Sequence, residues 1–127
     1  MTTPESDFDL TATIREMSQR TDPSFAIIAA SRVEDWLRAS IQTRMRMLSN
    51  KETERLFSGY GPLSTFSAMI DVAYAFSLFN ADIRNDLRAI KDIRNAFAHA
   101  RDPLHFASEK LAPLIQKLTG WTHGTNA

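Results

Sequence analysis

Residues 81–101 read ADIRNDLRAIKDIRNAFAHAR, and the spacing of the apolar side chains in this stretch decides the fold class. These side chains recur at intervals of three and four, which is the period of an α-helix with one buried face. They are Ile83, Leu87, Ile90, Ile93 and Phe97. The same period occurs elsewhere in the chain, and the alternation typical of strands is almost absent. The sequence therefore predicts an all-α protein, a single compact bundle of about five or six helices.

Turn and capping residues divide the rest of the chain. Asp22 and Pro23 mark a helix start, with Asp as the N-cap and Pro at the first helical position. We expect helices over residues 7–20, 23–48, 50–57, 63–79, 81–101 and 104–118, with a kink or break in the last one at Pro113. Ser49 or Asn50 is the candidate N-cap of the helix over 50–57. Asn80 or Asp82 is the candidate N-cap of the helix over 81–101.

These expected helices suggest a simple domain organisation. Residues 1–22 form an N-terminal extension with a short helix, and residues 23–118 form the helical domain. Residues 119–127 are expected to be a disordered tail.

The composition excludes several classes of function. The chain of 127 residues contains no cysteine, which rules out disulfides, thiolate zinc sites, iron–sulfur clusters and cysteine nucleophiles. Lys and Arg together number 15, and so do Asp and Glu, which gives a net charge of zero. Because a protein that coats DNA or RNA needs a basic surplus, this balance argues against such a role.

Nothing in the sequence predicts a membrane association. No apolar run reaches the roughly 18 residues that are needed to cross a bilayer. Residues 1–10 are polar and acidic, unlike the basic and then apolar start of a signal peptide. We therefore expect a cytoplasmic protein without membrane contact.

Two patterns resemble ligand sites only superficially. Residues 59–62, GYGP, lack the third glycine and the preceding strand of a dinucleotide-binding loop, so a tight turn is the better interpretation. His99, Asp102 and His105 are three residues apart, but a proline lies between them and no fourth ligand is near. We therefore expect no cofactor and no metal site.

The helix at residues 81–101 holds the candidate functional residues. Asn95 and His99 are four residues apart and project within about 40° of each other. Arg94 lies about 140° from His99 around the axis, where it borders the apolar stripe. A cation there needs a partner. An ion pair with Asp71 or Glu34 would make Arg94 structural, whereas a second subunit or a bound anion would make it functional.

Three segments share the order and spacing of their motifs with a known family. They are AIIAASRVEDWLRASI (26–41), LFSGYGPLSTFSAMIDVAYAFSLF (56–79) and DLRAIKDIRNAFAHA (86–100). Together they resemble the mannitol operon repressor (MltR) family over most of residues 23–101. The most specific part is Gly-Pro-Leu, then Ser, then apolar–Asp–apolar–Ala–Tyr.

The resemblance implies a fold and a function. Members of the MltR family are compact all-helical domains, and the founding role is negative regulation of a sugar-alcohol operon. The family has no recognisable DNA-binding element, and this chain shows no helix-turn-helix signature. The resemblance therefore implies a negative regulator of transcription in carbohydrate metabolism that acts through a partner.

Residues 94–99, RNAFAH, also resemble the signature of HEPN domains: Arg, a polar residue, three residues, then His. HEPN domains are small, helical and usually dimeric. In active members this signature forms a metal-independent ribonuclease site at the dimer interface. The resemblance implies that Arg94 binds the phosphate, His99 transfers a proton or activates the 2′-hydroxyl, and Asn95 positions both.

Two functions thus remain open. One is a dimeric, MltR-like regulatory or interaction module, and the other is a HEPN-type endoribonuclease that acts on RNA. We favour the first, because its resemblance covers more of the chain and because zero net charge fits poorly with RNA degradation. A sealed Arg94 ion pair would favour the module, whereas a basic groove formed by Arg94 and His99 of two subunits would favour the ribonuclease.

Overall fold

The computed structural model describes residues 8–20, 22–99 and 108–118. Within these ranges the chain forms six α-helices and no strand, which confirms the prediction of an all-α bundle. The helices are α1 (Leu10–Gln19), α2 (Pro23–Gln42), α3 (Asn50–Phe57), α4 (Phe66–Ala75), α5 (Ala81–His99) and α6 (Ser108–Ile115). No helix in the described ranges is long and apolar enough to cross a membrane.

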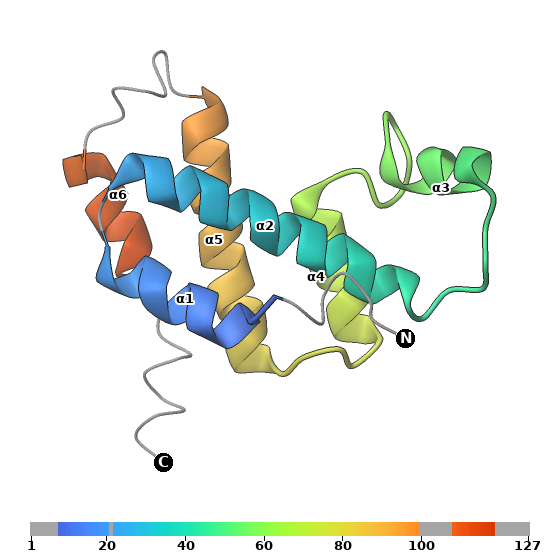
Figure 1. Ribbon diagram of the computed structural model, residues 1–127, viewed down its shortest axis with the longest axis horizontal. Coiled ribbons are helices and arrows are strands. Elements are labelled where there is room, and N and C mark those ends of the chain that lie inside the picture. Colours follow the sequence, from blue (N-terminus) through green and yellow to red (C-terminus); the bar gives the residue numbers. More distant parts are fainter. Residues whose placement is uncertain (1–7, 21, 100–107, 119–127) are drawn as a thin grey trace.

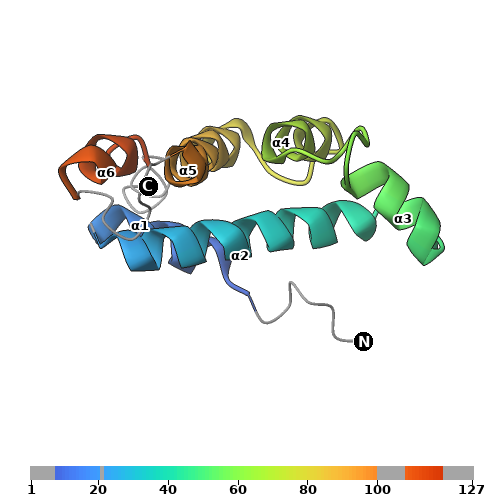
Figure 2. The same cartoon turned by 90° about the horizontal axis from the view of Figure 1, so that it is seen from above.

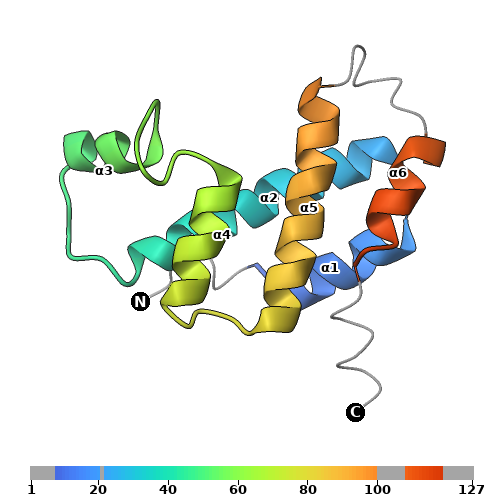
Figure 3. The same ribbon diagram turned by 180° about the vertical axis from the view of Figure 1, so that it is seen from behind.

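The helices form two layers, which Figure 2 shows from above. One layer contains α1 and α2, and the other contains α4, α5 and α6. The long helix α2 crosses α4 and α5 steeply and packs against both (Figure 1). Helix α3 projects at the end of the molecule where α2 finishes (Figure 3). Helix α2 is therefore the part of the first layer that packs against α4 and α5 of the second, while α3 stands outside the main body.

The hydrophobic core lies between these layers. The inward face of α2 is formed by small and branched side chains: Ala26, Ala29, Ala30, Val33, Leu37, Ser40 and Ile41. Helix α5 contributes Leu87, Ile90, Ile93 and Phe97 of its predicted stripe, and Ile83 is half-buried. Ile14 and Met17 of α1 join the same core. Burial of such apolar surface, worth about 25 cal/mol per Å², is the main force that holds the layers together.

Side-chain caps fix where several helices begin. Ser49 caps α3 in a capping box: its hydroxyl accepts a hydrogen bond from the N–H of Glu52 (3.1 Å), and its own N–H donates to the Glu52 carboxylate (2.9 Å). The amide oxygen of Asn80 accepts a backbone N–H at the start of α5 (3.0 Å). Asp22 precedes α2 as predicted, although its side chain makes no capping hydrogen bond. The structure thus selects Ser49 and Asn80 from the candidate caps.

Helix α2 is shorter than predicted. It ends at Gln42, whereas the apolar pattern predicted a helix over 23–48. The core beneath α2 ends at Ile41, and beyond it Met45 is only half-buried while Met47 is 97% exposed. With no core to cover, the segment after α2 turns away towards α3.

Helix α4 is also shorter than the predicted range of 63–79. Its start is late because the hydroxyl of Thr65 accepts a hydrogen bond from the backbone of the first turn (3.1 Å). The preceding loop instead folds back on α3, where the N–H of Leu63 donates to the carbonyl of Leu56 (2.8 Å). The helix ends early because Ser77 adopts a left-handed φ of 62°, which an α-helix does not accommodate.

Helix α6 continues through Pro113 and ends at Ile115, so the predicted break at the proline does not occur. The missing N–H of Pro113 would donate to the carbonyl of residue 109, so the proline removes only one hydrogen bond from this helix. Residues 104–107 of the predicted last helix, the predicted tail at 119–127 and the end of the predicted 81–101 helix beyond His99 lie outside the described residues.

Candidate functional site

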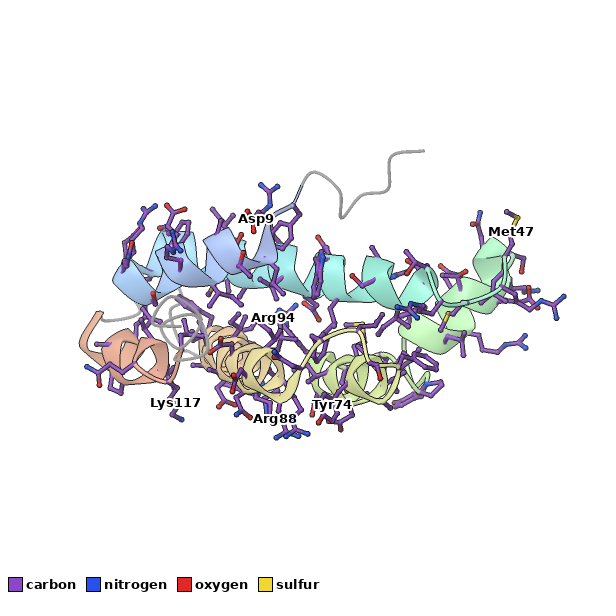
Figure 4. All side chains as sticks on the ribbon, turned by 90° about the horizontal axis from the view of Figure 1, so that it is seen from below. Asp9, Met47, Tyr74, Arg88, Arg94 and Lys117 are labelled. Atoms are coloured by element: carbon purple, nitrogen blue, oxygen red, sulfur yellow. The ribbon has the colours of Figure 1, made fainter. Side chains whose placement is uncertain are left out.

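The candidate residues Arg94, Asn95 and His99 lie in the C-terminal half of α5. The buried side chains of Ile93 and Phe97 hold this half of the helix against the core. Figure 4 shows Arg94 between the two layers, on the side of α5 that faces α2. The position matches its expected place at the border of the apolar stripe.

Arg94 forms an ion pair with Glu34 of α2. The distance between Nε of Arg94 and Oε1 of Glu34 is 3.0 Å, and the two side chains are 39% and 23% exposed. Of the two partners that the sequence allowed, the structure selects Glu34. Asp71 lies instead 3.8 Å from a guanidinium nitrogen of Arg88. The pair bridges the layers, but it is not sealed from solvent.

Asn95 and His99 are both exposed on α5. Neither side chain makes a hydrogen bond or an ion pair with another residue in the ranges 8–20, 22–99 and 108–118. His99 lies in the last turn of α5, where a protonated imidazole would interact favourably with the helix dipole.

One chain does not present Arg94 and His99 to the same atom of a substrate. Five residues separate them, which corresponds to about 140° around the helix and about 7.5 Å along it. Arg94 is directed towards α2, and His99 is exposed to solvent. A catalytic use of both residues would therefore need a second chain.

No protein-family model matches the chain, and neither a curated protein nor a solved structure matches it.

The GYGP segment is a tight turn, as predicted. Gly59 has a left-handed φ of 61°, a conformation that favours glycine. A Cβ atom on Gly61 would overlap the backbone carbonyl oxygens of Arg55 and Leu56. Between these two glycines the side chain of Tyr60 is fully exposed. The loop has a structural reason for each glycine and needs no bound phosphate to explain it.

The described residues contain no group of three His, Asp or Glu side chains that could hold a metal ion. Asp102 and His105, which form the weak metal pattern with His99, lie outside the described ranges.

The sequence patterns did not point to Asp86, whose side chain is completely buried in α5. A signal was available, because Asp86 precedes Ile90 by one turn and so falls on the apolar stripe. The sequence patterns also gave no sign that the Arg84 guanidinium stacks on the ring of Tyr74, at 4.2 Å from the ring centre. This contact joins α5 to α4.

Proposed function

We propose that this chain is a non-enzymatic, MltR-like regulatory or interaction module. It acts in the cytoplasm as a negative regulator of transcription in carbohydrate metabolism, as a homodimer and through a partner protein. The observation that carries the proposal is the ion pair between Arg94 and Glu34, which engages the guanidinium in a contact between helices although the pair is not sealed from solvent. It gives the RNAFAH segment a structural role in joining two layers of helices.

The carboxylate of Glu34 also argues against a phosphate site at Arg94. A guanidinium that stabilises a phosphate must offer its N–H groups to the phosphate oxygens. Here one of these groups is directed at Glu34, 3.0 Å away. A phosphate would have to displace this carboxylate or lie beside it, and like charges at short range repel.

The mixed charges of α5 support a mode of action without direct DNA contact. Lys91 lies 3.3 Å from a carboxylate oxygen of Asp92, and Arg88 lies within 4 Å of Asp71. A helix that reads DNA instead offers unpaired basic side chains to the phosphates and base edges.

The HEPN-type ribonuclease is the second candidate, and one observation favours it. Arg94 is 39% exposed, and Asn95 and His99 are both exposed on α5. A second copy packed on this part of α5 would bring two sets of these residues together. In that case Arg94 binds the phosphate and His99 transfers the proton.

An RNA cleavage assay in the presence of a chelator separates the two candidates. It compares the wild-type chain with His99→Ala and with Asn85→Ala, an exposed position on the same helix. We expect no cleavage by any of the three folded proteins. Cleavage that His99→Ala abolishes and Asn85→Ala retains, with cyclic-phosphate ends, would establish the ribonuclease instead.

A transcript measurement tests the regulatory role directly. Deletion of the gene should raise transcription of a sugar-alcohol operon, and wild-type complementation should lower it again. Complementation with His99→Ala should also restore repression, because the proposed module does not need this side chain. Unchanged transcripts after deletion would contradict the proposal.

A further inference from the structure

A small hollow lies beside α2, where this helix meets the end of α3, the loop after α3 and α4. Figure 3 shows these elements together at one end of the molecule. The hollow has a volume of about 90 Å³. At about 30 Å³ for each water molecule, this is room for about three waters, so it suits a small molecule. The apolar part of its lining is buried and consists of Phe57, Leu63 and Met69.

Two charged side chains that line the hollow have no partner of opposite charge. They are Asp35 and Arg38, three residues apart on α2 and so about 60° apart around it. Within the part of the chain that the structure describes, neither forms an ion pair or a hydrogen bond with another residue. Glu34 also lines the hollow, but its carboxylate already has Arg94 as a partner at 3.0 Å. One negative and one positive charge at the hollow are therefore unpaired.

The guanidinium of Arg38 is positioned by an aromatic ring. It lies over the ring of Phe57, 4.8 Å from the ring centre, and Phe57 is itself fixed in the core. This contact provides no oxygen acceptor, so the N–H groups of Arg38 remain available to a carboxylate.

Backbone hydrogen bonds fix the other side of the hollow. The N–H of Leu63 donates to the carbonyl of Leu56 (2.8 Å), and the N–H of Ser64 donates to the carbonyl of Gly61 (3.2 Å). The hydroxyl of Ser64 adds a donor and an acceptor to the lining. Because this wall is already ordered, a ligand does not have to pay the entropy of ordering it.

We infer that the hollow binds a small α-amino acid in its zwitterionic form. The carboxylate of the ligand accepts N–H groups of Arg38, and its ammonium group lies beside Asp35. A side chain no larger than that of alanine or serine contacts the apolar lining. The site goes beyond the proposed regulatory role, which requires no bound small molecule.

The balance of charges favours a zwitterion over other small molecules. Asp35 would repel an anion bound at Arg38, and Arg38 would repel a cation bound at Asp35. A neutral molecule would displace water from both groups without neutralising either. A ligand that carries both charges on neighbouring atoms neutralises both side chains at once.

An NMR titration of the backbone amides tests the site, with L-alanine as the probe. We expect saturable shifts around Phe57, Leu63 and Ser64, with a dissociation constant in the millimolar range because the ligand is so small. Propionate lacks the ammonium group and ethylamine lacks the carboxylate. Each of these two analogues should therefore bind at least about tenfold more weakly than L-alanine.

Two single variants assign the two charges. Asp35→Asn removes the partner of the ammonium group, and it should weaken L-alanine binding about tenfold. Arg38→Met removes the partner of the carboxylate but keeps an unbranched stem against Phe57, and it should have an effect of similar size. The matched controls are Asp82→Asn and Arg88→Met, which change exposed residues of α5 and should bind as the wild type does.

A third variant closes the hollow without a change of charge. Ser64→Leu places a larger apolar side chain in the lining, and it should abolish binding. Circular dichroism would establish that every variant is folded. Because this variant leaves Arg38 and Phe57 in place, it tests the site even if Arg38→Met unfolds the chain.

Several outcomes would overturn the site. They are a folded wild type without saturable shifts at high millimolar L-alanine, equal binding of propionate or ethylamine, and binding that Asp35→Asn or Ser64→Leu retains in full. None of these results bears on the transcript measurement, which tests the regulatory role separately.

Discussion

The guanidinium of Arg94 on α5 lies 3.0 Å from the carboxylate of Glu34 on α2, and this ion pair connects the two layers of the fold. The exposed pair of Arg20 and Glu16, in contrast, connects the end of α1 to the residue that follows it. Since the Arg94 pair is partly withdrawn from water and bridges separate helices, it contributes more to stability than a surface pair does.

Replacement of Arg94 by Ala should therefore lower the free energy of unfolding by about 1 kcal/mol, whereas His99→Ala should leave it unchanged. Glu34→Ala should have an effect similar to that of Arg94→Ala. In urea unfolding, the double variant should lose less than the two single losses combined, with a coupling of about 0.5–1 kcal/mol. Strictly additive losses would show that the ion pair contributes nothing.

The capping box of α3 gives a prediction about local stability. Ser49→Ala removes the hydroxyl that accepts the N–H of Glu52, and it should destabilise α3 by about 1 kcal/mol. Because α3 stands outside the main body, we expect the loss in amide exchange of α3 rather than in global melting. Ser67→Ala, an exposed position in α4, serves as the control. Equal exchange in wild type and Ser49→Ala would contradict the prediction.

The pH dependence of stability follows from three exposed carboxylates. Hydrogen bonds from backbone N–H groups lower the pKa of Asp9 and of Glu52, and the hydrogen bond from Arg20 lowers the pKa of Asp22. A carboxyl group with a lower pKa in the folded chain stabilises it above its unfolded pKa, and this contribution is lost as the pH falls through the folded value.

We therefore expect the melting temperature to be level near neutral pH and to fall below about pH 4. Glu52→Gln should remove part of this acid dependence from the amide exchange of α3. Thermal scans between neutral pH and acid would measure the first effect. A melting temperature that rises as the pH falls below this range would contradict the assignment.

The two glycines of the tight turn should respond differently to substitution. Gly61→Ala places a methyl group against backbone carbonyl oxygens of Arg55 and Leu56, which cannot move without displacing the end of α3. Gly59→Ala meets no atom within 4 Å and carries only the strain of its positive φ, about 1 kcal/mol. Gly61→Ala should therefore speed the amide exchange of α3 clearly more than Gly59→Ala does. Equal effects would mean that the turn relaxes around residue 61.

Local signals predicted much of the fold. The period of three and four predicted the helices, and Asp22, Ser49 and Asn80 marked where three of them begin. The ends of α2 and α4 could not be predicted in this way. They depend on where the core stops beneath Ile41 and on how Ser77 leaves the helix, which are properties of the packed chain.

The candidate site was predictable only in part. The angle between Arg94 and the apolar stripe indicated that the guanidinium needs a carboxylate, and Glu34 was one of two candidates. The choice between Glu34 and Asp71 depends on how α2 and α4 lie against α5, which no local pattern contains. The burial of Asp86, in contrast, could have been predicted, because this residue falls on the apolar stripe of α5.

The balance of acidic and basic side chains has a consequence for handling the protein. A molecule with no net charge has no overall repulsion that keeps its copies apart in water of low ionic strength. Its solubility should therefore be lowest near neutral pH without salt and should rise when salt is added.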